Sequence, residues 1–87
     1  MGAKRSEIVI VTWRDARFYP ETRNTEKMKG IRMAVFESVG HLISRDDTTT
    51  IIAAELNDEG DYRDVTLIPS GSIESVRRLS LGSPLAM

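Results

Sequence analysis

The segment from residue 65 to residue 79 is Val65-Thr66-Leu67-Ile68-Pro69-Ser70-Gly71-Ser72-Ile73-Glu74-Ser75-Val76-Arg77-Arg78-Leu79. Proline has no backbone N–H to donate to a sheet, so Pro69 marks the end of a first strand. The Ser70-Gly71-Ser72 run is rich in turn-forming residues, and Ile73 restarts the apolar pattern. The segment therefore predicts a strand, a tight corner and a second strand in a small all-β domain.

Three more strands are predicted upstream of this corner. Residues 7–14 are nearly all β-forming and apolar on both faces, which is typical of a central strand. Residues 31–44 form a longer strand region, in which Gly40 predicts a bulge or a sharp bend. Turns at Asp46-Asp47 and at residues 57–61 bound a third strand. The five predicted strands are residues 7–14, 31–44, 48–56, 63–68 and 73–79. Between the first two, residues 15–29 predict a long connection with at most a short helix.

Length and composition limit the chain to one small domain. The sequence has 87 residues, no cysteine and a net charge of −1. Without cysteine, neither a disulfide framework nor a thiolate metal site is possible. No apolar run approaches the roughly 20 residues that span a membrane, so we expect a cytoplasmic protein without membrane contact. We expect one domain at residues 7–79, with flexible tails at 1–6 and 80–87.

The charge is divided unevenly along the chain. Residues 1–45 contain nine Lys and Arg against five Asp and Glu, whereas residues 46–87 contain three Arg against eight Asp and Glu. Two solvated faces of different charge explain this division, and it could also drive head-to-tail self-association.

Several landmarks resemble a family of small uncharacterised proteins encoded by bacteriophages, prophages and other mobile elements. The landmarks are Trp13-Arg14-Asp15-Ala16, Ser38-Val39-Gly40-His41-Leu42-Ile43, Thr50-Ile51-Ile52-Ala53, and Ile68-Pro69 with Ile73. They cover most of residues 10–79, and the loop after Trp13 departs most from the family. The resemblance implies an accessory role in a mobile element and assigns no site.

The order of these elements is also similar to SH3-like and Sm-like barrels. A long strand bent at a glycine, two short hairpins and a closing corner carry this second resemblance. We therefore expect a mainly β protein, a small five-stranded SH3-like or Sm-like barrel with a long loop or short helix after the first strand. Sm-like proteins assemble rings and bind RNA, but an Ile-Arg-Gly-type signature is absent here, and Ser70-Gly71-Ser72 lacks the basic residue of the Sm loop.

Catalytic and metal-binding patterns are missing from the sequence. His41 is the single histidine, without a nucleophile motif nearby or a second histidine for a metal, and we interpret it as a strand residue. The acidic residues within 57–64 do not have EF-hand spacing and predict a turn. We therefore expect no enzyme, no catalytic or metal site and no cofactor.

A group of basic residues follows the first strand and gives a candidate nucleic-acid site. Its members are Arg14, Arg17, Arg23, Lys27, Lys29 and Arg32, with the aromatic residues Trp13, Phe18 and Tyr19 nearby. Cations can contact phosphates and aromatic rings can stack on bases. Asp15, Glu21 and Glu26 are interleaved with the cations, and Trp13 fits a core position. A solvated loop with inward-facing aromatics is the competing interpretation.

Two functions follow as hypotheses. The first is a non-enzymatic interaction or self-assembly module, a homo-oligomer or protein-binding domain that uses its strand edges. Residues 48–56 are long, β-rich and uncharged until Glu55, and we expect them to form such an edge. The alternative is an Sm-like domain that binds RNA or single-stranded DNA through the basic group.

Overall fold

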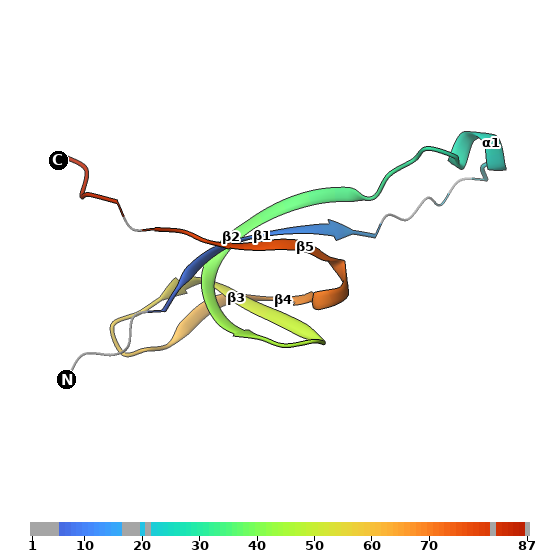
Figure 1. Cartoon of the computed structure of the whole chain (residues 1–87). Helices are drawn as coiled ribbons and strands as arrows, with labels where there is room; N and C mark the ends of the chain where they lie inside the picture. The colour runs from blue at the N-terminus through green and yellow to red at the C-terminus, as the bar shows by residue number, and fades with distance from the viewer. Residues whose placement is uncertain (1–5, 17–19, 21, 81, 87) are drawn as a thin grey trace.

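The computed structural model describes residues 6–16, 20, 22–80 and 82–86. Within these residues the chain forms five strands, a one-turn α-helix and a 3₁₀ turn (Figure 1). The elements are β1 (Ile8–Asp15), α1 (Thr25–Met28), β2 (Ala34–Arg45), β3 (Thr49–Leu56), β4 (Tyr62–Pro69), η1 (Ser70–Ser72) and β5 (Ile73–Arg78). All five strands belong to one antiparallel sheet in the order β4-β3-β2-β1-β5. The predicted mainly β class and the five strands are confirmed.

The corner at Pro69 forms as predicted. β4 ends at Pro69, the three serine and glycine residues form η1, and β5 begins at Ile73. The backbone N–H of Ser70 donates to the carbonyl of Thr48 at 3.0 Å, which ties the corner to the start of β3. β2 begins three residues later than expected, because its pairing with β1 ends at the Asp15–Ala34 pair.

The core consists of side chains from one face of the curved sheet. Val9, Val11, Ile52 and Ile68 are buried together. Trp13, Leu42, Ile73 and Val76 pack against this cluster and are partly exposed. Val9 and Val11 are buried on the same face because residues two apart along a strand share a face. Val11 lies opposite Val76 in the β1–β5 pair. A domain of this size has room for only a thin core.

Gly40 allows β2 to bend across β3. β2 is strongly curved in Figure 1. A Cβ atom at Gly40 would lie 2.8 Å from the carbonyl oxygen of Ala53 and 3.1 Å from the Cβ of Ile52. The change of register lies just beyond it, between Leu42 and Ser44. The glycine therefore provides a close approach of two backbones, and the bulge that it predicted lies two residues further on.

Two expectations about the sheet need correction or refinement. Residues 48–56 were expected to form an edge, but β3 lies inside the sheet between β2 and β4, so that assignment is wrong. The edges are β4 and β5, which do not pair with each other among the described strands. The sheet is therefore curved but open, and the closed barrel stays a prediction.

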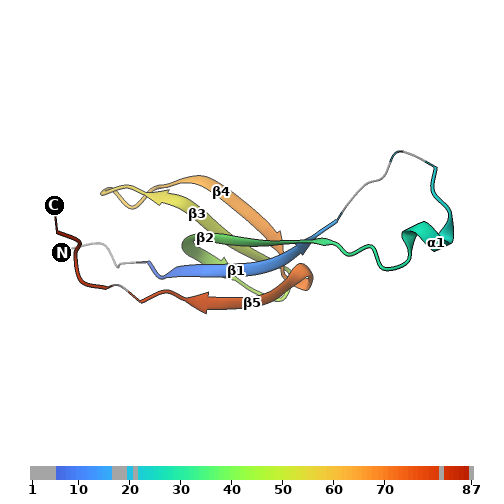
Figure 2. The same cartoon turned by 90° about the horizontal axis from the view of Figure 1, so that it is seen from above.

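The connection between β1 and β2 extends far from the sheet. We call residues 22–33 the arm; they include α1, which lies at the tip in Figures 1 and 2. The Asn24 side chain caps α1 by accepting the N–H of Lys27 at 2.8 Å. This confirms the expected long connection with a short helix. The arm contributes to the 60 Å length of the molecule, which is only 31 Å and 21 Å across.

The predicted tails are described only in part. Of the predicted flexible tails, residues 1–5, 81 and 87 lie outside the described residues, and residues 82–86 have no regular secondary structure. None of the helices in the described residues is long and apolar enough to cross a bilayer.

Candidate functional site

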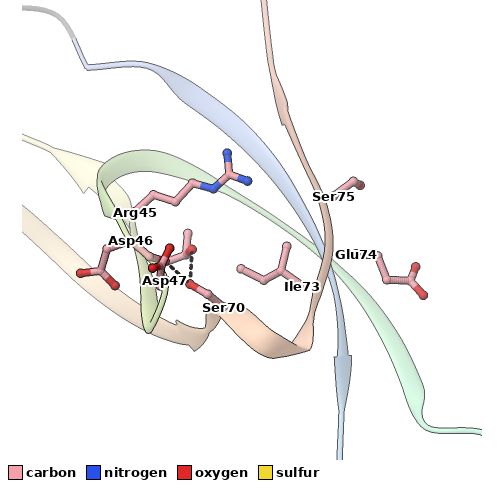
Figure 3. Close-up of a pocket in the computed structure, with 8 residues that line it drawn as sticks. Arg45, Asp46, Asp47, Ser70, Ile73, Glu74 and Ser75 are labelled. Atoms are coloured by element: carbon pink, nitrogen blue, oxygen red, sulfur yellow. Dashed lines mark hydrogen bonds between the residues drawn. The ribbon is translucent and has the colours of Figure 1, made fainter.

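A pocket of about 450 Å³ lies at the corner, between the β2–β3 turn and the η1–β5 segment (Figure 3). Its lining comes from both sides of the opening and is mostly polar. The lining residues are Arg45, Asp46, Asp47, Thr50, Ser70, Ile73, Glu74 and Ser75.

Two of the pocket's hydroxyl groups serve the fold. The Ser70 hydroxyl donates to the carbonyl of Asp46 at 2.7 Å. Since that proton is committed, the Thr50 hydroxyl, 3.2 Å away, is the donor to the Ser70 Oγ. Thr50 is fully buried, and this bond satisfies its polar group. The chain of hydroxyls therefore joins β3, the corner and the β2–β3 turn.

The Asp46 carboxylate organises the turn between β2 and β3. Its Oδ1 accepts the backbone N–H groups of Thr48 and Thr49, each at 2.8 Å. Both bonds favour the ionised form, with Thr49 having the larger effect, and they lower the pKa of Asp46 below its ordinary 3.8. The predicted Asp46-Asp47 turn is confirmed, and the structure adds that Asp46 holds it together.

This turn should weaken in acid. Because the pKa of Asp46 is lower in the folded state, the stabilisation is present above pH 3.8 and is lost as the pH falls through the folded-state value. We expect the urea midpoint of the wild type to fall more steeply below about pH 5 than that of Asp46→Asn, which keeps an oxygen acceptor but does not titrate. Asp47→Asn is the matched control and should follow the wild type. Parallel profiles for the wild type and Asp46→Asn would contradict the proposed role of Asp46.

The remaining charges leave one cation available in the pocket. Glu74 forms an ion pair with Arg14 and points away from the opening. Arg45 extends its guanidinium from the β2–β3 turn into the space toward β5 (Figure 3) and has no ion pair among the described residues. No hydrogen bond pairs a nucleophile with a base in the described lining. The polar lining of this pocket, with the Arg45 guanidinium, suits recognition of a polar group.

A second pocket of about 370 Å³ lies between the start of β1, the middle of β2 and the ends of β3 and β5. Its lining comprises Ser6, Glu7, Ile8, His41, Leu56, Arg78 and Leu79. The Ser6 Oγ lies 2.8 Å from Nδ1 of His41, and Glu7 and Arg78 form an ion pair at 3.1 Å. No sequence pattern indicates this Ser–His pair, because 35 residues separate its members.

The Ser6–His41 pair lacks the other parts of a hydrolytic site. A serine–histidine nucleophile needs a third group to orient the imidazole and donors for the oxyanion. Nε2 of His41 has no hydrogen bond among the described residues. The backbone N–H of Leu42 also donates to the carbonyl of Glu7 at 2.8 Å. Together with this bond, the Ser6–His41 contact fixes the segment before β1 to β2.

The structure divides the basic group that the sequence singled out. Arg23, Lys27, Lys29 and Arg32 lie on the arm, while Arg14 lies on β1 in its ion pair with Glu74. Arg17, Phe18 and Tyr19 lie outside the described residues.

Trp13 is held against the sheet by its neighbours on β2. Its ring is 5.4 Å from that of Phe36, and its Nε1 donates to the Ser38 hydroxyl at 3.0 Å. The described cations of this group therefore do not form one surface around an available tryptophan.

The remaining candidate features are the acidic β3–β4 turn and the edge strand β4. Asn57 accepts the N–H groups of Glu59 and Asp61, which confirms the predicted acidic turn. In the described part of the chain, no three His, Asp or Glu side chains are placed to hold a metal ion. Along the edge strand β4, Tyr62 to Leu67 are all exposed, and Leu67 is 63% exposed.

Comparison of the chain with protein-family models, curated proteins and solved structures gave no match. The resemblance to mobile-element proteins therefore stays a prediction.

Proposed function

We propose that the protein is a non-enzymatic interaction module that assembles with copies of itself by strand addition at the edges of its sheet. The observation that carries this proposal is the edge strand β4, in which Val65 and Leu67 are 45% and 63% exposed. They point to the same face, because they are two residues apart. An edge strand with unpaired backbone groups and exposed apolar side chains is a template for another strand.

The second copy is the partner that this arrangement supports best. β4 pairs only with β3 and β5 only with β1 among the described strands, so each copy has one free edge on either side. Addition of β5 from one copy to β4 of the next uses two different surfaces. Such heterologous contacts repeat, and they generate a ring where the rotation closes and a filament where it does not. The sequence resemblance supports placing this module in a mobile element.

A charge on β4 should weaken this assembly. We expect Leu67→Lys to shift the protein toward monomer in sedimentation or light-scattering measurements over a range of concentrations, because charges on edge strands oppose strand addition. The folding free energy should change by no more than about 0.5 kcal/mol, since the side chain is exposed. Leu85→Lys is the matched control, because Leu85 is 89% exposed and lies outside the sheet. A wild type that stays monomeric at high concentration would contradict the proposal.

Nucleic-acid binding is the second candidate, and the gathering of four cations on the arm favours it. A titration with single-stranded RNA and DNA at about 50 mM salt tests it, because phosphate contacts are strong at low salt. Binding that weakens steeply with added salt would support this function, and absence of binding would exclude it.

A further inference from the structure

The arm carries more basic than acidic side chains. It contains Arg23, Lys27, Lys29 and Arg32 against a single acid, Glu26. Glu26 is paired with Lys29 at 3.1 Å. Lys27 and Arg32 are exposed and have no ion pair among the described residues.

The arm also exposes apolar side chains next to these cations. Ile31 is 38% exposed and Met33 is 50% exposed, and neither lies in a strand. The arm therefore has both the charge and the apolar surface of a segment that packs against a partner.

A pocket with complementary chemistry lies at the β3–β4 turn. We call this pocket, of about 340 Å³, the turn pocket; its lining is Glu55, Leu56, Asn57, Asp61, Tyr62 and Arg63. Arg63 neutralises Glu55 through bonds of 3.0 Å and 2.6 Å. Asp61 has no such partner among the described residues, and Leu56 and Tyr62 provide apolar surface beside it.

The chemistry of the turn pocket suits one long basic side chain. The aliphatic stem of Lys or Arg can pack on apolar side chains while its charged head reaches a carboxylate. The ring of Tyr62 can add a cation–π contact. Asp58 and Glu59, in the same turn, extend the negative potential around the opening, and neither has an ion pair in the described part of the chain.

The turn is held in a fixed shape. Oδ1 of Asn57 accepts the N–H of Glu59 at 3.0 Å and that of Asp61 at 2.8 Å. Gly60 has a φ of 90°, which glycine adopts without strain. The acceptor surface is therefore preorganised, and docking there orders little more of the acceptor chain.

The arm and the turn pocket lie at opposite ends of the molecule. The arm extends from one end of the long axis, and the β3–β4 turn lies toward the opposite end, on the side of the C-terminal segment, in both views (Figures 1 and 2). The molecule is 60 Å long, so the two cannot meet within one chain. Copies arranged end to end bring them together.

We propose that the arm of one copy docks on the turn pocket of the next, with Lys27 or Arg32 inserted beside Asp61. This rests on the proposed self-assembly, but it uses the ends of the molecule, whereas strand addition uses the lateral edges of the sheet. The contact is heterologous and repeats from copy to copy. It is also electrostatic, so added salt should weaken it.

Charge reversal on each side tests the pairing. The arm variant is Lys27→Glu/Arg32→Glu, and the turn variant is Asp58→Lys/Asp61→Lys. We expect each variant alone to associate on the order of tenfold more weakly than the wild type at low salt, because like charges then face each other. Mixing the two variants restores complementary ends and should restore association, as should all four substitutions in one chain. Sedimentation velocity measures association, and circular dichroism with urea unfolding confirms that each variant is folded.

Other outcomes overturn the proposal. Unchanged self-association of the arm variant, or failure of the mixture to recover, shows that the arm and the turn do not pair. If the arm variant self-associates normally but loses binding to a single-stranded RNA oligonucleotide, the arm is a nucleic-acid element. The Leu67→Lys variant separates the two interfaces. If Leu67→Lys associates as the wild type does, and this association depends on charge, the strand-addition proposal is wrong and the arm contact stands. If Leu67→Lys no longer associates while the arm variant associates as the wild type does, strand addition stands and the arm contact is wrong.

Discussion

Ile68→Ala is expected to lower the free energy of unfolding by about 2–4 kcal/mol. Ile68 is 1% exposed and packs with Val9, Val11 and Ile52 in the core. Its loss removes apolar contacts and leaves a cavity that a curved sheet with a thin core can only partly refill. Domains of this kind have a total stability of about 5–15 kcal/mol, so the variant should show a large drop in urea midpoint or fail to fold.

The adjacent residue on β4 provides the matched control. Leu67 points to the opposite face and is 63% exposed. We expect Leu67→Ala to change stability by no more than about 0.5 kcal/mol. Val11→Ala probes the same core from β1 and should also lower the urea midpoint, because Val11 is fully buried. Similar effects at positions 67 and 68 would show that the two faces of β4 are assigned incorrectly.

Local signals in the sequence were sufficient for the strands and the corner. Pro69 removes a donor and the adjacent serines and glycine favour a turn, so the end of β4 follows from a few neighbouring residues. The order of the strands depends on the whole chain. The mistaken edge assignment of residues 48–56 relied on composition alone. The two predicted hairpins on either side already implied an interior strand, because a tight turn places consecutive antiparallel strands side by side.

The candidate sites were less predictable because they join distant residues. Arg14 was grouped with the basic residues that follow it, but its partner Glu74 is 60 positions away. Likewise, Thr50 and Ser70 meet only once β3 and the corner are in place. The arm was more accessible to prediction. Its cations are close in sequence, and residues 15–29 predict a long connection outside the strands. What the sequence could not supply was the position of the arm relative to the turn pocket.

Gly40→Ala is expected to destabilise the protein by about 3 kcal/mol or more, through overpacking at the bend of β2. The new methyl group would lie 2.8 Å from the carbonyl oxygen of Ala53, which is closer than real Cβ atoms approach such an atom. That oxygen belongs to the backbone of the interior strand β3, so it cannot rotate away as a flexible side chain would. β2 and β3 must therefore separate, and Ile52 in the core must move with them. A lower urea midpoint or an insoluble product is the expected result.

Gly71→Ala is the matched control for this substitution. A Cβ at Gly71 meets no atom within 4 Å, and its φ lies outside the left-handed region. The change should be neutral or should raise stability by about 0.4–1 kcal/mol, because alanine reduces the entropy of the unfolded chain. If Gly40→Ala were equally harmless, β2 would not cross β3 at this distance. The curvature of β2 would then need another cause.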